Sequence, residues 1–349
     1  MDNPSLSPAQ LGFRLPPEWA PQAAVWLSWP SNPALWAGQF ERIPPFFAHF
    51  AAMLSRFVKV RINAEGKTHA AIRSLLEKAG ADTSAVELFD HPVNDVWCRD
   101  HGPLFVKNAQ TGEVAVTDWG FNAWGGKFAP FDLDNAVPAR IAASLGMKRF
   151  ANDINLEGGA IEINGPGQVL TTEAVLLNPN RNPGLTRDDY TRLLARGLGA
   201  TDVLWLKGGL PNDDTDGHID NLARFFRNDG ILTVVPPDSD DHPAAHVLRQ
   251  NHLALDEFLT PDEKRFEIVT LPLPWPPVEH EGRELPASYA NYLVTNGAVL
   301  LPVFQRPTDE KAAGVLRRCF PTREIVPLDC TDVLLEGGSL HCLSQQQPA

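Results

Sequence analysis

The side chain best suited to covalent chemistry lies near the end of the chain. Cys342 stands in LLEGGSLHCLSQQQPA, where two glycines precede it, His341 is its neighbour and three glutamines follow. A tail of small and polar residues has little core to build, so packing alone gives no reason for a cysteine here. The run is typical of a short strand entered through a glycine turn. We therefore treat Cys342 as a candidate nucleophile, with an inert thiol as the alternative.

A candidate acid and base lies in the stretch NDDTDGHIDNLAR. If this stretch is a strand, His218 and Asp220 are two positions apart and point to one face. A histidine beside a carboxylate can give and take protons, and a thiol with a pKa near ~8.5 needs such a partner before it attacks. The alternatives are a structural histidine and an aspartate that caps a turn.

Two more polar stretches supply further carboxylates. NDVWCRDHGP holds Asp95 and Asp100 on either side of Arg99, and NLEGGAIE holds Glu157. The plain alternatives are a local ion-pair network around Arg99 and a surface carboxylate at Glu157. Loops at one end of a strand scaffold commonly carry binding and catalytic groups, so we predict that these acids lie together with the thiol.

An excess of acid indicates the kind of substrate. It would suit a neutral amide poorly, whereas a carboxylate holds a guanidinium by two parallel hydrogen bonds. Two carboxylates would hold the planar cation and leave its central carbon open to a thiolate. Asp213 and Asp214 are candidates for a distant amine, and Trp97 and Trp124 are either core aromatics or lids on a ligand.

Metal chemistry is not indicated by the spacing of the remaining residues. The sequence has no HxxxH, HxH or DxDxDG motif, and its four cysteines form no CxxC pair. We expect His91, His101 and His341 to be local hydrogen-bonding residues, the thiols to be reduced, and the protein to need neither a metal nor a cofactor.

Composition narrows the partners and the compartment. The 349 residues carry a net charge of −13, which disfavours nucleic acid and anionic membranes and suits a small cationic ligand. The N-terminus has no basic start or apolar region of a signal peptide, and no run approaches the length of a membrane span. These features predict a cytoplasmic protein.

The elements that would position the candidates alternate along the chain. Apolar spacing predicts a buried strand in AVWLSWP and helices near 43–57, 69–79, 135–145, 187–196, 243–258 and 309–318, each helix followed by a strand. Pairs of further strands lie between helices, which gives about five α/β units, the last completed by the N-terminal strand. TDVLWLKGGL resembles TDVLLEGGSL, and LEGGAIEI resembles LEGGSLHC. Repetition predicts a ring of similar units in a single domain, residues 1–349.

The chain also resembles the agmatine deiminase family, which is related to bacterial peptidylarginine deiminases within the guanidino-group-modifying superfamily. The matching stretches run in order over nearly the whole chain: LPPEWAPQAAVWLSWP, NDVWCRDHGPLFV, FNAWGG, LEGGAIEINGPG, LLNPNRNP, DTDGHIDNLARF, PASYANYLVTNGAVLLPVF and GGSLHCLSQQQP. The resemblance implies a five-bladed α/β-propeller of ββαβ units with the active site on its axis, no cofactor, and a possible homodimer.

Residue roles follow from the same resemblance. It implies Cys342 as nucleophile, His218 as acid and base, and Asp100 and Asp220 as the carboxylates that grip the guanidinium. Glu157 would orient the histidine or help to hold the substrate. Asp95, Asp214, Trp97 and Trp124 would contact the rest of the substrate. The implied reaction is hydrolysis of agmatine to N-carbamoylputrescine and ammonia through an amidino-cysteine.

Several alternatives remain open on the sequence. DTDGH differs from the DTNGH of some agmatine-specific members, so free or peptidyl arginine is a possible substrate. An amidinotransferase would use the same covalent intermediate with an amine in place of water. A guanidine-binding protein without catalysis and a cysteine hydrolase of amides are the remaining readings.

Overall fold

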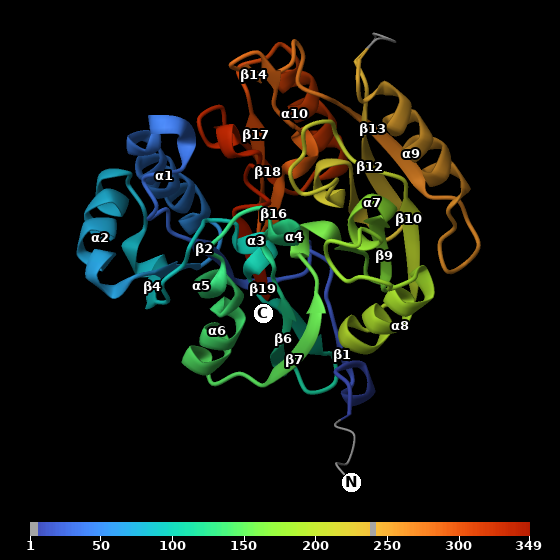
Figure 1. The fold of residues 1–349 in the computed structure, drawn as a ribbon, viewed down its shortest axis with the longest axis horizontal. Coiled ribbons are helices and arrows are strands. Elements are labelled where there is room, and N and C mark those ends of the chain that lie inside the picture. The colour runs from blue at the N-terminus through green and yellow to red at the C-terminus, as the bar shows by residue number, and fades with distance from the viewer. Residues whose placement is uncertain (1–5, 238–241) are drawn as a thin grey trace.

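The computed structural model describes residues 6–237 and 242–349. Within these ranges the strands form five sheets of three or four strands and one two-stranded hairpin, β14 (Glu279–His280) with β15 (Arg283–Glu284). Short helices α3 (Cys98–His101) and α4 (Ala123–Gly126) lie near the middle of the view in Figure 1, and the longer helices lie around the outside. None of the described helices is long and apolar enough to cross a membrane.

Four of the sheets share one order of strands. In each, an antiparallel pair is followed by a parallel partner, and a parallel partner requires a crossover, which the helices supply. Their strands are β1 (Phe13–Arg14), β5 (Leu104–Asn108), β6 (Val114–Gly120) and β7 (Arg149–Asn155); β8 (Glu162–Ile163), β9 (Gln168–Thr172) and β10 (Asp202–Leu206); β11 (Ala223–Arg227), β12 (Gly230–Val235) and β13 (Glu267–Pro272); and β16 (Leu293–Thr295), β17 (Ala298–Val303) and β18 (Glu324–Asp329).

The fifth sheet joins the two ends of the chain. Its order is β19 (Ser344–Pro348), β2 (Gln22–Ser28), β3 (Val60–Ala64) and β4 (Val86–Asp90). Strand β19 is antiparallel to β2, with Ser344 opposite Leu27, and the other pairs are parallel. The prediction that the N-terminal strand completes the last unit is confirmed, and this pairing anchors the turn that carries Cys342.

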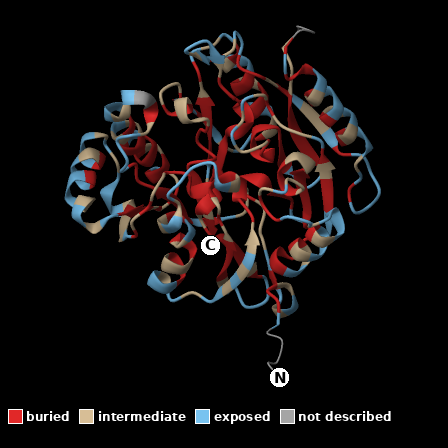
Figure 2. Ribbon diagram, in the orientation of Figure 1, coloured by how far each residue is buried: buried red, intermediate tan, exposed pale blue. Residues whose placement is uncertain are grey.

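Each predicted helix is present; most lie with one face against a sheet, and the helix over residues 69–78 packs mainly against the helix over residues 43–55. The longer helices are α1 (Ile43–Ser55), α2 (His69–Lys78), α6 (Val137–Leu145), α8 (Arg187–Leu198), α9 (Ala245–Glu257) and α10 (Thr308–Cys319); short ones are α5 (Asp132–Asn135) and α7 (Glu173–Leu176). Figure 2 shows buried strands inside and exposed outer helix faces. In α1, Phe47, Phe50 and Leu54 are fully buried, as their spacing predicts.

Two local predictions were wrong. His218 and Asp220 do not lie in a strand, because residues Ile219–Asn221 form a 3₁₀ turn, η7, and β11 begins only at Ala223. Cys342 also lies in a turn, just before β19. Cys342 is not in a strand because its backbone N–H donates to the Asn291 side chain at 3.3 Å and not to a neighbouring strand.

The two sequence echoes have different structural meanings. In TDVLWLKGGL the central residues form the strand β10, whereas in TDVLLEGGSL they form a 3₁₀ helix, η9 (Val333–Glu336). That likeness is therefore coincidental. LEGGAIEI and LEGGSLHC both lead into the strand that opens an antiparallel pair, β8 and β19, so the second echo marks equivalent places.

Candidate active site

Five short turns bring the predicted residues together. Each precedes the strand that opens an antiparallel pair, and Asp100, Glu157, His218, Asp220 and Cys342 lie in or beside four of them. The turns are α3, η6 (Gly158–Ala160), η7, η8 (Tyr289–Asn291) and residues 340–343. Neighbouring turns contact one another in chain order, α3 with η6, η6 with η7 and η7 with η8, and α3 also contacts β19. Residues far apart in sequence thus meet at one place.

The candidate nucleophile is held between an amide and a carboxylate. Cys342 is buried, its Sγ accepts a hydrogen bond from Asn291 Nδ2 at 3.0 Å, and it lies 3.6 Å from Asp220 Oδ2. Burial raises the pKa of the thiol well above its ordinary value, and the nearby charges of Asp220 and Asp100 raise it further. The resting group is a neutral thiol, and an incoming cation would favour the thiolate.

The two carboxylates beside the thiol are fixed differently. Asp100 accepts hydrogen bonds from the Gly159 N–H and the Trp124 indole, both at 3.0 Å. Asp220 accepts a hydrogen bond from His341 Nδ1 at 2.7 Å through Oδ2, while its buried Oδ1 has no partner among the described residues. Burial raises the pKa of Asp100 to about 6. Burial is the largest influence on Asp220 too, but the hydrogen bond from His341 and the charges of His341, His218 and Arg224 together outweigh it and lower that pKa.

The candidate acid and base is surrounded by carboxylates. His218 is fully buried, with Nδ1 at 3.7 Å from Asp100 Oδ1 and Nε2 at 3.5 Å from Glu157 Oε2. Both distances are long for hydrogen bonds. Burial lowers the pKa of His218, but the charges of Asp100, Glu157 and Asp220 outweigh it and raise the pKa to about 9. The imidazole is therefore protonated at neutral pH.

Glu157 is held by a residue that sequence reasoning did not single out. Arg181 Nε donates to Glu157 Oε1 at 2.6 Å, and Arg181 Nη1 donates to Asp216 Oδ2 at 2.5 Å. Burial opposes the charged form of Glu157, but the nearby His218 imidazolium and the Arg181 guanidinium lower its pKa. Arg181 lies in LLNPNRNP, and that stretch was the only signal for it.

Two glycines allow these groups to come close. A Cβ added to Gly159 would lie 2.5 Å from His218 Nδ1, 2.8 Å from Asp100 Oδ1 and 3.0 Å from Asp220 Oδ2. One added to Gly338 would lie 2.3 Å from the Trp97 ring. These distances are below van der Waals contact, so any side chain at either position would displace the site. They also show that the three polar atoms converge on one point.

A cavity of about 700 Å³ opens onto Cys342. Seven of the predicted residues line it: Asp95, Trp97, Asp100, Trp124, Asp213, Asp214 and Cys342. Asp220 lies behind Cys342, His218 lies behind Asp100, and Glu157 lies beyond them, 3.5 Å from His218 Nε2. Trp97 and Trp124 are both buried and pack edge to face at 6.4 Å between ring centroids, so they belong to the core and to the cavity wall at once.

The outer part of this cavity is acidic. Asp95, Glu336, Asp213 and Asp214 line it, and burial together with the charge of Glu336 raises the pKa of Asp95 to about 7. Burial also raises the pKa of Glu336. Arg283 Nη2 lies 3.7 Å from Asp214 Oδ1 at the rim. The wall thus offers several carboxylates to a cation, and Arg283 and Lys127 to an anion.

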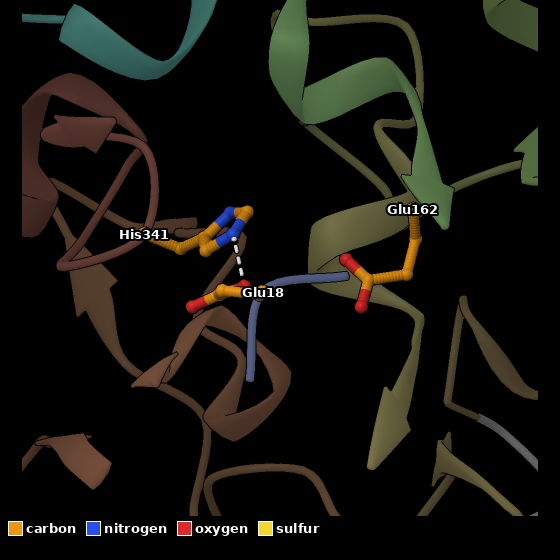
Figure 3. Close-up of side chains that lie close together, drawn as sticks. All are labelled: Glu18, Glu162 and His341. Atoms are coloured by element: carbon orange, nitrogen blue, oxygen red, sulfur yellow. Dashed lines mark hydrogen bonds and ion pairs between the residues drawn. The ribbon is translucent and has the colours of Figure 1, made fainter. Parts of the chain in front are cut away.

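The described residues contain one group that could be mistaken for a metal site. Glu18, Glu162 and His341 each place a potential ligand atom within 4.8 Å of the others (Figure 3). Arg224 already donates to both carboxylates, at 2.8 Å to Glu162 Oε2 and by a short contact to Glu18 Oε2. A cation here would displace a buried guanidinium, so this group is an internal ion-pair network.

The structure decides the predictions made for two histidines, the cysteines and Arg99. His91 bonds to Asn63 and Ser144, and His101 bonds to Ser28, so both are local hydrogen-bonding residues as predicted. All four cysteines are free thiols. The alternative of an ion-pair network around Arg99 was wrong, because its side chain bonds to the Gln346 side chain and the His341 carbonyl.

The structure defines a mixed α/β protein with a buried thiol among carboxylates at its candidate site. Comparison with known proteins gives the family. Residues 14–348 match the model of the Porphyromonas-type peptidyl-arginine deiminases, and the chain belongs to this family. It is 36% identical to an agmatine deiminase of Pseudomonas putida, with 98% of this chain and 97% of that protein covered. An agmatine deiminase of Pseudomonas aeruginosa is 34% identical over 100% of this chain and 99% of that protein.

Solved structures share the fold over the same length. The agmatine deiminase of Enterococcus faecalis superposes with a TM-score of 0.93 at 28% identity, covering 99% of this chain and 98% of that one. A substrate-bound cysteine-to-serine variant of the C. jejuni agmatine deiminase gives 0.87 at 32% identity, covering 97% and 96%. The mixed α/β fold is therefore that of the agmatine deiminase structures.

Proposed function

We infer that this chain is an agmatine deiminase, a hydrolase that converts agmatine and water into N-carbamoylputrescine and ammonia. The full-length likeness to agmatine deiminases supports this. The observation that carries it is the grouping of His218, Asp100 and Asp220 within 3.0 Å of one point at Gly159, with Asp220 Oδ2 lying 3.6 Å from Cys342 Sγ. Burial opposes the charged form of Asp100 even with His218 beside it, and a guanidinium between Asp100 and Asp220 would offset that cost.

The substrate would enter through the acidic cavity with its guanidinium first. Asp100 and Asp220 would grip the guanidinium, and Trp97 and Trp124 would flank it and the alkyl chain. Asp95 and Asp214 would face the distant ammonium, with Glu336 beside them. Since a carboxylate at this end of the substrate would meet three acids, the wall favours agmatine over arginine.

The reaction would proceed in two halves. The bound cation favours ionisation of Cys342, which loses its proton to solvent in the cavity, and the thiolate attacks the guanidinium carbon. Protonated His218 then gives its proton to the departing ammonia, which leaves an amidino-cysteine. The neutral imidazole takes a proton from water, the hydroxyl adds to the same carbon, and collapse releases the thiolate and the ureido product. Glu157, fixed by Arg181, would keep His218 in position.

We further propose that the five sheets are the blades of one propeller, residues 1–349, with the site on its axis. The shared strand order, the closure of the last sheet by β2 and the contacts between successive turns support this. A cytoplasmic location and a homodimer remain predictions from the sequence and the family resemblance.

A second substrate has one observation in its favour. Arg283 lines the cavity rim, where it could pair with the carboxylate of free or peptidyl arginine. The alternative is weaker, because Asp214 already lies 3.7 Å from Arg283. An Arg283→Gln variant separates the two substrates, since it would reduce turnover of arginine but not of agmatine.

The function is tested by measuring ammonia and ureido product from agmatine, arginine and an arginyl peptide, with and without an added amine. Wild-type protein should turn over agmatine, and Cys342→Ser should not. Transfer of the amidino group to the amine would indicate an amidinotransferase. Absence of any product from folded wild-type protein would reject the deiminase assignment.

A further inference from the structure

A chain of buried polar groups runs from Asp220 away from the substrate cavity. His341 Nδ1 lies 2.7 Å from Asp220 Oδ2, and His341 Nε2 lies 3.0 Å from Glu18 Oε2. All three side chains are at most 5% exposed. Figure 3 shows the His341 ring nitrogen aimed at the Glu18 carboxylate. The imidazole thus bridges a carboxylate beside Cys342 and one outside the cavity.

The far end of this chain is fixed to the scaffold. Glu18 Oε1 accepts a hydrogen bond from the Val294 backbone N–H at 2.6 Å, and Glu18 Oε2 also accepts one from Arg224. Arg224 in turn donates to the Ala290 carbonyl at 3.0 Å and the Tyr292 carbonyl at 2.8 Å. Glu18 is therefore bound to the segment around β16 and cannot easily move with respect to His341.

The two contacts of His341 need two hydrogens. A carboxylate oxygen accepts hydrogen bonds and cannot donate them, and a neutral imidazole has only one N–H. Both contacts are hydrogen bonds only when the network holds one proton more than a neutral imidazole between two carboxylates. Burial and the charges of Arg224 and Arg99 lower the pKa of His341 and oppose that proton, while Glu18 and Asp220 favour it. The 2.7 Å contact with His341 leaves Asp220 Oδ2 little freedom, while Oδ1 has no partner among the described residues.

We propose that His341 and Glu18 are positioning residues, which together hold Asp220 so that its unpartnered oxygen is presented to the substrate. The idea rests on the proposed function for the identity of the cation. His341 touches neither the cavity nor the substrate in this account, because it acts through the carboxylate. A small displacement of such a group is expected to lower the rate by about 100-fold.

Two variants of His341 separate this role from simple packing. The amide nitrogen of asparagine falls near the place of Nδ1, so His341→Asn keeps a donor for Asp220. The amide of glutamine falls near Nε2, so His341→Gln keeps the contact with Glu18 and loses that donor. We expect His341→Gln to lower kcat/KM for agmatine by about 100-fold, and His341→Asn to restore most of that loss.

The control is His91, another buried histidine with both ring nitrogens bonded but outside the site. His91→Gln should lower the melting temperature without changing the ratio of kcat to KM. Equal activity of the Asn and Gln variants of His341, whether both are active or both are inactive and folded, would overturn the proposal.

Binding measured in a Cys342→Ser background makes the test independent of turnover. The Kd for agmatine, obtained by calorimetry, should be weakened by His341→Gln and much less by His341→Asn. If wild-type protein does not turn over agmatine but the two variants still differ in binding, the proposed function fails and the positioning role stands. If their Kd values are equal, the positioning role fails whatever the activity.

Discussion

Two pairs of carboxylates lie near the middle of the molecule, and they differ in what stands between them. Glu18 and Glu162 hold the guanidinium of Arg224, which also bonds two backbone carbonyls. Asp100 and Asp220 hold no arginine, and they lie beside Cys342 at the end of an open cavity. The chain thus already binds one guanidinium with two acids, and it presents a second pair that lies beside the imidazoles of His218 and His341.

The difference explains the pKa pattern. Burial opposes the charge of Glu18, but Arg224 and His341 hold its pKa well below the ordinary range. Burial raises the pKa of Asp100 to about 6, although His218 opposes the rise. A permanent guanidinium stabilises Glu18 and Glu162, whereas Asp100 in the other pair retains an unmet preference for a cation. That preference is what we expect a substrate to satisfy.

The largest effect on activity is expected when Asp100, in the pair beside Cys342, loses its charge. Asp100→Asn should lower kcat/KM for agmatine by about 10²–10³-fold, since it removes one electrostatic contact with the reacting cation. Stability should change little, because a charge that burial opposes is lost together with its pairing to His218. Asp118, a buried carboxylate paired with Arg149, is the matched control. A kcat/KM for Asp100→Asn within threefold of wild type would contradict the comparison.

Glu18 and Glu162, which hold Arg224, should respond in the opposite way, with a loss of stability when their charged partner is removed. Arg224→Met leaves Glu18 and Glu162 buried without their cation, which should lower the free energy of unfolding by about 3–5 kcal/mol. Arg56→Met breaks an exposed pair with Glu324 and should cost less than about 1 kcal/mol. Urea denaturation measures both. Similar losses for the two variants would show that the internal guanidinium is not a structural cation.

The smallest expected effect is the pH dependence of kcat/KM, which sharpens the comparison between the two pairs. Asp100 must be ionised to hold the substrate, so activity should fall as the pH drops through about 6. His218 must be protonated to release ammonia, so activity should fall as the pH rises through about 9. If Asp95 binds the ammonium, the acidic limb for agmatine should lie nearer about 7, and that for an alkylguanidine without an amine nearer 6. Identical limbs for both substrates would exclude Asp95 from the amine site.

Sequence reasoning recovered the periodic parts of the fold and the residues with distinctive chemistry. The spacing of Phe47, Phe50 and Leu54 predicted α1, and the alternation of helices and strands predicted five similar units. Cys342 and His218 stood out because a cysteine in a polar tail and a His-x-Asp pair in a polar stretch are unusual. Their local structure was wrong, since a side chain 51 residues away supplies the hydrogen bond that shapes the Cys342 turn.

The missed residues share a physical reason. His341 was predicted to bond locally, but its partners Asp220 and Glu18 lie 121 and 323 residues away in sequence. Arg224 and Arg181 are ordinary charged residues until the fold buries them. Asn291 could have been found, because it occupies the turn before β16 that corresponds to the turns of Asp100, Asp220 and Cys342. Repeat position was the available signal.

The most direct test of the central claim is to trap the covalent intermediate. Wild-type protein is mixed with agmatine, quenched in acid within one turnover, digested and analysed by mass spectrometry. We predict an amidino group on the peptide that contains Cys342 and on no other cysteine peptide, with none after Cys342→Ser. Turnover of agmatine with an unmodified Cys342 at every quench time, or with modification elsewhere, would contradict the account.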